Sequence, residues 1–129
     1  MVPQVAKLLR KERLPDATLC KPAQEVLVGT LGAGEADLGG GLFKKRLARP
    51  GGGKSGGYRA IVAYWPPRAD RVLVTYAFAK NATSTLTPQV HEALTKVAQA
   101  FVAANNEQLA ELLASRDVSE VACDDDNEG

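Results

Sequence analysis

Three stretches in the middle of the chain have the alternating pattern of large side chains that is typical of β-strands. They cover residues 42–49, 58–65 and 71–79. Pro66 and Pro67 lie between the second and third stretches and predict a hairpin-like loop that is longer than a tight turn. Alternation along the third stretch predicts a set of residues on one face: Val72, Val74, Tyr76 and Phe78.

Helical patterns flank these strands on both sides. The helices are predicted over residues 4–12, 22–31, 87–105 and 106–114. Thr87 can cap the third of them, and residues 118–123 predict a short final strand. The expected fold class is α+β. We expect a single domain over residues 1–123 and a disordered acidic tail over residues 124–129.

Several classes of protein are disfavoured by what the chain lacks. It has no apolar run near the ~20 residues that a membrane span needs, and residues 1–11 do not resemble a secretory signal, so we expect a cytoplasmic protein without membrane contact. Cys20 and Cys123 lack metal-ligand spacing, which predicts two free thiols. His91 is the only histidine, which argues against a histidine-centred triad. No metal or other cofactor is expected.

Charge is distributed unevenly although the net charge of the chain is only +1. Between residues 42 and 80 nine basic residues face one acid, which gives +8, whereas residues 81–129 carry −7. Such a concentrated positive field attracts polyanions, of which nucleic acid is the commonest. The segment from 42 to 80 therefore predicts RNA binding.

The loop over residues 51–57 (GGGKSGG) is similar to a nucleotide-binding P-loop but lacks two of its features. Ala48 occupies the position of the first required glycine, and the loop leads into a strand pattern instead of a helix. Its glycines still allow backbone N–H groups to approach an anion closely. Lys54 within the loop, with Arg49 and Arg59 beside it, adds positive charge for phosphate.

Residues 41–59 (GLFKKRLARPGGGKSGGYR) resemble the HigB-like branch of the RelE/ParE superfamily of bacterial type II toxins. Residues 76–81 (YAFAKN) are similar to the third-strand motif of that branch, with Ala77 in place of the usual glycine. The resemblance implies a small antiparallel sheet of three to four strands packed against N-terminal and C-terminal helices. It also implies an endoribonuclease that cuts mRNA on the translating ribosome. The implied partner is a cognate antitoxin, often a helix-turn-helix DNA-binding protein.

RNA cleavage without a metal can use the 2′-hydroxyl of one ribose against the adjacent phosphate. A base must take the hydroxyl proton, cations must stabilise the phosphorane, and an acid must protonate the leaving 5′-oxygen. With one histidine, we expect these tasks to fall mostly to lysine, arginine, tyrosine or the acidic residues, and a lysine among neighbouring cations can serve as the base. The candidate catalytic residues are Lys44, Arg46, Lys54, Arg59, Tyr76 and Lys80.

Strand alternation separates these candidates from their neighbours. Lys44 and Arg46 are expected on one face of the first strand, and Lys45 and Arg49 on the other. If the first face coincides with the face of Tyr76, the catalytic candidates surround one cleft for an anionic ligand. Lys45 is interpreted as a solvated charge or a ribosomal RNA contact. The candidate RNA- or ribosome-binding residues are Lys45, Arg49, Ser55 and Arg71.

Two other functions stay open at this point. A ParE-type toxin that inhibits DNA gyrase by binding would need no catalytic base. A non-catalytic RNA-binding module would use charge and a few aromatic residues, which make up only 5% of the chain.

Overall fold

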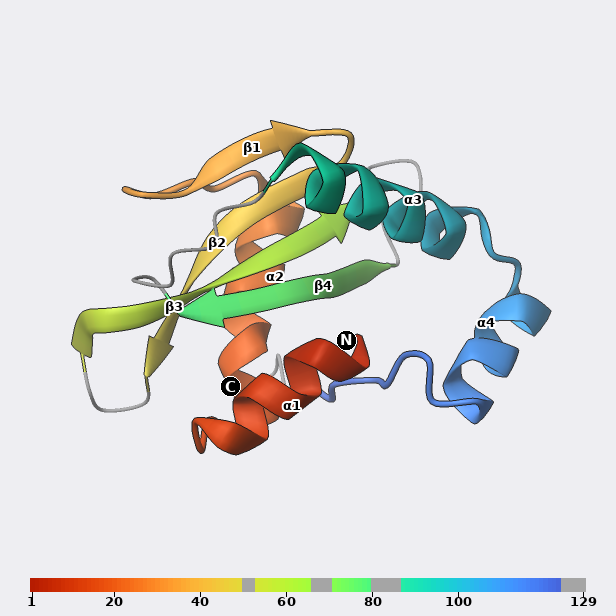
Figure 1. The fold of residues 1–129 in the computed structure, drawn as a ribbon, viewed down its shortest axis with the longest axis horizontal. Coiled ribbons are helices and arrows are strands. Elements are labelled where there is room, and N and C mark those ends of the chain that lie inside the picture. The colour runs from red at the N-terminus through yellow and green to blue at the C-terminus, as the bar shows by residue number, and fades with distance from the viewer. Residues whose placement is uncertain (50–52, 66–70, 80–86, 124–129) are drawn as a thin grey trace.

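The computed structural model describes residues 1–49, 53–65, 71–79 and 87–123. In chain order the elements are α1 (Pro3–Lys11), a 3₁₀ turn (Asp16–Leu19), α2 (Cys20–Val28), β1 (Ala36–Gly39), β2 (Leu42–Arg49), β3 (Gly53–Tyr64), β4 (Val72–Ala79), α3 (Pro88–Ala103) and α4 (Asn106–Ala114). The strands form one antiparallel sheet in the order β1-β2-β3-β4, with helices packed against it (Figure 1). The predicted α+β class is confirmed.

Strand β1 is a strand that the sequence pattern did not predict. Gly39, Gly40 and Gly41 all have positive φ angles, between 65° and 84°, a region that glycine enters far more readily than other residues. Gly39 pairs with Leu42, so Gly40 and Gly41 form the tight turn of a hairpin. The glycines therefore add a short strand to the edge of β2.

One face of the sheet packs against α1 and α2. Its core contains Val5, Leu9, Leu14, Leu19, Val26, Leu47, Tyr58, Ala60, Val62, Val74 and Ala77. Helix α1 also closes the outer edge of β4, because the Gln4 side chain donates to Ala77 O (2.8 Å) and accepts from Ala77 N (3.0 Å). This amide takes the place of a further strand.

The other face packs against α3 over part of its length. Leu42, Ile61, Ala63 and Leu73 are buried there with Ala98 of α3. Figure 1 shows α3 over the upper right part of the sheet, while the paired ends of β2 and β3 extend to the left of it. Exposure rises in that direction along β2, from the buried Leu42 to the half-buried Lys44 and Arg46.

A β-bulge at Thr75 divides β4 into two parts. Ile61 pairs with Tyr76, but the next residue of β3, Val62, pairs with Val74. Thr75 lies between these pairs, and its hydroxyl donates to Ile61 O at 3.0 Å. The extra residue reverses the alternation of side chains. The prediction of one shared face was therefore wrong: Tyr76 and Phe78 lie on the α3 face, whereas Val72 and Val74 join the α1–α2 core.

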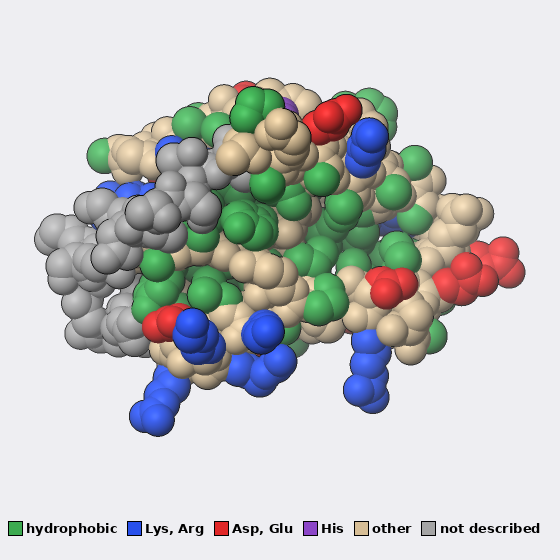
Figure 2. All heavy atoms as spheres, viewed as in Figure 1, with side chains coloured by type: hydrophobic (Ala, Val, Ile, Leu, Met, Phe, Trp, Pro, Cys, Tyr) green, Lys and Arg blue, Asp and Glu red, His purple; other side chains and the backbone are tan. Residues whose placement is uncertain are grey.

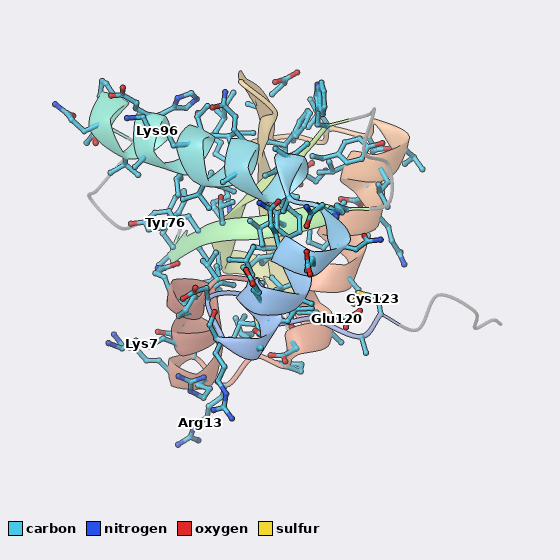
Figure 3. The ribbon with its side chains drawn as sticks, turned by 90° about the vertical axis from the view of Figure 1, so that its right-hand side faces the viewer. Lys7, Arg13, Tyr76, Lys96, Glu120 and Cys123 are labelled. Atoms are coloured by element: carbon cyan, nitrogen blue, oxygen red, sulfur yellow. A yellow bond between two sulfur atoms is a disulfide. The ribbon has the colours of Figure 1, made fainter. Side chains whose placement is uncertain are left out.

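The C-terminal segment packs beside the N-terminus instead of forming the predicted strand. Residues 118–123 have no regular secondary structure, although the Met1 amino group donates to Ser119 O (2.7 Å) and Ser119 N donates to Met1 O (2.8 Å). Cys123 is disulfide-bonded to Cys20 (Figure 3). The prediction of free thiols was wrong. The fold brings two cysteines that are 103 residues apart in the sequence to a Cα–Cα distance of 5.6 Å, which is within the range of a disulfide.

The four predicted helices are confirmed with small shifts of their ends. Helix α2 stops at Val28, because Gly29 has a left-handed conformation (φ 79°) and caps it. Thr87 Oγ1 accepts from Val90 N at 3.2 Å, which confirms the predicted cap of α3. None of the helices in the described ranges is long and apolar enough to cross a membrane. The predicted tail, residues 124–129, lies outside the described residues.

Candidate functional site

The register of the sheet brings several candidate residues together on the α3 face. Lys44 pairs with Ile61, which in turn pairs with Tyr76. Arg46 pairs directly with Arg59. Directly paired residues of antiparallel strands project to the same side of the sheet. Lys44, Arg46 and Arg59 therefore form one cationic face, and Tyr76 lies on the same side.

The two arginine side chains lie near the loop between α2 and β1. Arg46 Nη1 donates to Ala33 O at 3.4 Å, and Arg59 Nη1 donates to Tyr58 O at 3.3 Å. A β-carbon at Gly34 would lie 3.7 Å from Arg59 Nη2 and 3.8 Å from Arg46 Cδ. No carboxylate in the described part of the chain forms an ion pair with either guanidinium. Both guanidinium groups can therefore donate to an external anion.

The aromatic residues on this face lie next to each other. The ring centroids of Tyr76 and Phe78 are 5.8 Å apart, and the planes are tilted by 36°. Both side chains pack partly against the core beneath α3. Figure 3 shows Tyr76 on the side of the sheet between α3 and α1, where its half-buried side chain reaches the surface. A ring in this position can stack on a base or donate its phenolic proton.

Four of the candidate residues cannot be placed by their side chains. Those of Arg49, Lys54 and Ser55 are not described, and Lys80 lies outside the described residues altogether. The backbone of Lys54 belongs to strand β3, which runs from Gly53 to Tyr64. A P-loop would open a helix at this point, so the prediction that this loop is not a P-loop is confirmed.

Lys45 is a buried residue, contrary to the prediction of a solvated charge or RNA contact. Its side chain is 0% exposed on the α1–α2 face of β2. The ammonium donates to Thr30 O (2.7 Å) and to Glu35 Oε1 (2.7 Å), and it lies 3.1 Å from Glu25 Oε1. Strand alternation correctly assigned Lys44 and Lys45 to opposite faces of β2, but the face that holds Lys45 is the buried one.

Arg71 is also buried, contrary to its predicted role in RNA or ribosome binding. Its Nη1 donates to Phe101 O (2.8 Å) and to Ala104 O (2.6 Å) at the end of α3. Its guanidinium carbon lies 5.7 Å from the centroid of the Phe101 ring. Arg71 therefore fastens the C-terminal end of α3 to the start of β4.

Glu35 is the residue that sequence reasoning missed. Its carboxylate accepts from Arg46 N (2.9 Å), Gly32 N (2.7 Å) and the Lys45 ammonium (2.7 Å). Burial disfavours its charge, but these hydrogen bonds outweigh that effect and hold the pKa of Glu35 below its ordinary value. Glu35 lies outside the basic segment 42–80 and before a strand that the sequence pattern did not predict, and its closeness in sequence to that segment was the available signal.

A second group of basic residues lies on α1, in a part of the sequence whose basic and acidic residues are equal in number. Lys7, Arg10 and Lys11 are all exposed on α1. The nearby Glu12 is engaged, since its Oε1 accepts from the Tyr58 hydroxyl at 2.6 Å. Figure 2 shows basic side chains standing out along the lower edge of the molecule, where α1 lies, and Figure 3 shows Lys7 pointing away from it.

The chemistry available on the cationic face is that of phosphate binding and proton transfer. Two opposed guanidinium groups can bind phosphate oxygens, and Lys44 and Tyr76 carry exchangeable protons. The His91 ring lies on α3 with Nε2 3.2 Å from Leu38 O. No group of three or more histidine, cysteine or acidic residues among the described residues could hold a metal ion.

Comparison with known protein families gives a match over most of the chain. The model of the RelE toxin of the RelE/RelB toxin–antitoxin system matches residues 3–121. No curated protein and no solved structure gave a significant match. The matched range runs from the first residue of α1 into the C-terminal segment, so it includes the whole cationic face.

Proposed function

Because the chain belongs to the RelE family of toxins from toxin–antitoxin systems, we propose that it is a ribosome-dependent endoribonuclease that cuts messenger RNA and so stops translation. The observation that carries the proposal is the direct pairing of Arg46 with Arg59 on the side of the sheet that holds Lys44 and Tyr76. The finer assignment to the HigB-like branch rests on residues 41–59 and 76–81.

The arginine pair would bind the phosphate at which the message is cut. A guanidinium group donates two parallel hydrogen bonds to phosphate oxygens, and it keeps its charge at all physiological pH values. Charge develops on those oxygens when the phosphorane forms, so donors already held in place stabilise the transition state more than the ground state. This is the role we assign to Arg46 and Arg59.

Proton transfer would fall to the remaining residues of the site. The Lys44 side chain makes no hydrogen bond or ion pair within the described part of the chain and lies two register positions from the arginine pair, which fits a base that takes the 2′-hydroxyl proton. Tyr76 would protonate the leaving 5′-oxygen or stack on the neighbouring base. Lys54 and Lys80 are proposed as further cations of the same site, and Arg49 and Ser55 as RNA contacts.

The family implies an antitoxin as the partner of this chain. We propose that this partner is encoded beside the toxin and is a RelB-type or helix-turn-helix protein. The toxin would act in the cytoplasm, where ribosomes translate. Its nucleophile would be the 2′-hydroxyl of the substrate, so the proposed reaction requires no cofactor.

A translation reaction tests the proposal directly. Purified protein is added to a cell-free system that translates a defined message, and primer extension maps any new 5′ ends. We expect cuts within the translated region and none in the same RNA without ribosomes. A message that stays intact while translation continues would refute the proposal.

The same preparation distinguishes the other candidate functions. An intact message together with loss of gyrase supercoiling activity would identify a ParE-type toxin. An intact message together with salt-dependent RNA binding would identify a non-catalytic binding module.

A further inference from the structure

Strand β1 ends just short of the arginine pair. The first residue of β1, Ala36, pairs with Lys44. The next N–H of β2 on this edge belongs to Arg46, and β1 does not extend far enough to accept it. Glu35 Oε2 accepts this N–H at 2.9 Å. The carboxylate thus takes the place of a strand backbone beside Arg46, and an unpaired buried donor is avoided.

The other carboxylate oxygen of Glu35 closes the loop that leads into β1. Oε1 accepts from Gly32 N (2.7 Å) and from the Lys45 ammonium (2.7 Å). The same ammonium donates to Thr30 O (2.7 Å) at the other end of the loop. The side chains of Lys45 and Glu35 are 0% and 7% exposed. A buried ion pair therefore holds the loop at both ends.

The closed loop in turn contacts Arg46 and lies close to Arg59. Ala33 O accepts from the Arg46 guanidinium, and Gly34 turns in a left-handed conformation (φ 79°) close to Arg46 and Arg59. A glycine here lets the backbone approach both side chains closely. Hydrogen bonds thus link the buried Lys45–Glu35 pair to the Arg46 guanidinium, and the Arg59 guanidinium lies close to the same loop.

We propose that Glu35 is a positioning residue that holds Arg46 and the loop at Ala33–Gly34, and through them the arginine pair, in the geometry that binds an RNA phosphate. The inference rests on the proposed function in treating this pair as the phosphate-binding part of the site. It assigns Glu35 no contact with the substrate.

The charge of Lys45 explains how an acid can serve a phosphate site. An uncompensated carboxylate beside two arginines would compete with phosphate for them. Lys45 takes up the charge of Glu35 at 2.7 Å on the core side of the sheet, so the guanidinium groups keep their capacity for an external anion. Lys45 is buried and does not contact RNA, but it supports the site by compensating the charge of Glu35.

Binding of a labelled RNA tests the proposal without requiring cleavage. The probe is a fluorescein-labelled single strand of about 12 nucleotides, with 2′-O-methyl groups that block cutting, and binding is followed by anisotropy at low salt. Removing an acid should by charge alone strengthen binding to a polyanion. We expect the opposite for Glu35→Gln, a loss of about tenfold, because misplaced donors bind poorly.

Glu25→Gln is the matched control. The Glu25 side chain also contacts the Lys45 ammonium, but within the described part of the chain it forms no hydrogen bond with Arg46 or with the loop. Its backbone oxygen accepts from Thr30 N at 2.9 Å, a bond that the substitution leaves in place. The same change of charge and size should leave binding within about twofold of wild type or strengthen it slightly.

A double-mutant cycle shows whether Glu35 acts through Arg46. In an Arg46→Ala background, Glu35→Gln should weaken binding by less than about twofold, since the interaction that it supports is already lost. Thermal unfolding identifies variants that are folded at the assay temperature. If Glu35→Gln is not, Glu35→Asp replaces it, which keeps the charge and shortens the reach by one methylene.

The outcomes separate this inference from the proposed function. Wild-type affinity in the Glu35 variant, an equal loss in both backgrounds, or no binding by wild type would overturn the positioning role. RNA binding with the expected pattern, but no cuts in a translated message, would overturn the nuclease and leave the positioning role supported.

Discussion

Arg46 and Arg59 lie directly opposite each other on β2 and β3, so two positive charges share one cross-strand pair. Like charges in this position destabilise a sheet. A phosphate between them would reverse the sign of that interaction, because each guanidinium donates to anionic oxygen. The pair is therefore expected to lower the stability of the protein alone and to strengthen its complex with RNA.

Replacing Arg59 with alanine should lower activity without lowering stability. Arg59→Ala removes the like-charge contact, so the unfolding temperature should stay the same or rise, while message cleavage falls about 10²–10³-fold through loss of a transition-state donor. Thermal melts and primer extension measure the two effects. Lys7→Ala removes an exposed cation of α1 and should change neither by much. Cleavage by Arg59→Ala at the wild-type rate would contradict the proposed site.

Two adjacent lysines should respond in opposite ways. Lys45→Met leaves Glu35 buried without its counter-charge, and breaking a buried pair costs about 3–5 kcal/mol. Lys44→Met should change the free energy of unfolding by less than about 0.5 kcal/mol but abolish cleavage if Lys44 is the base. Urea unfolding and the translation assay give the comparison. Equal destabilisation by both changes would contradict the assignment of faces.

The contrast between Lys44 and Lys45 also shows how far the sequence alone could lead. Alternation on a strand correctly assigned the two residues to opposite faces. Which face is buried depends on where α1, α2 and α3 pack. The partners of Lys45, at positions 25, 30 and 35, come from a helix and a loop that no local pattern connects to β2. The burial of Lys45 was therefore outside the reach of periodicity.

Other differences arise where one residue alters the regular pattern. The bulge at Thr75 reverses the alternation within β4, and no local sequence signal marks it. The cationic face was predictable nevertheless, because Arg46 and Arg59 lie on regular parts of their strands. The Cys20–Cys123 bond was not, since it depends on the path of the whole chain.

Acid should destabilise the protein partly through Glu35. Its pKa in the folded state lies below the ordinary value of 4.5, so the unfolded chain binds its proton first as pH falls. The stabilisation is complete above about pH 5 and is lost as pH falls below 4.5 toward the folded-state pKa. Glu35→Gln should therefore show a shallower loss of stability over this range in urea unfolding at a series of pH values. The same slope in both proteins would contradict the ionised network.

Reduction of the Cys20–Cys123 bond should lower stability without changing the activity of the site. The bond closes a loop of 103 residues, for which the chain-entropy estimate is about 4.7 kcal/mol as an upper value, because native strain and residual structure reduce it. It ties the C-terminal segment to the start of α2, and neither cysteine contacts Lys44, Arg46 or Arg59 in the described part of the chain.

Thermal unfolding with and without dithiothreitol should show a lower midpoint in the reduced protein. Cys123→Ser should match the reduced form and no longer respond to the reductant. Message cleavage should be equal in both redox states, because the proposed action on translating ribosomes would take place in a reducing cytoplasm. Loss of cleavage on reduction would show instead that the C-terminal segment supports the cationic face.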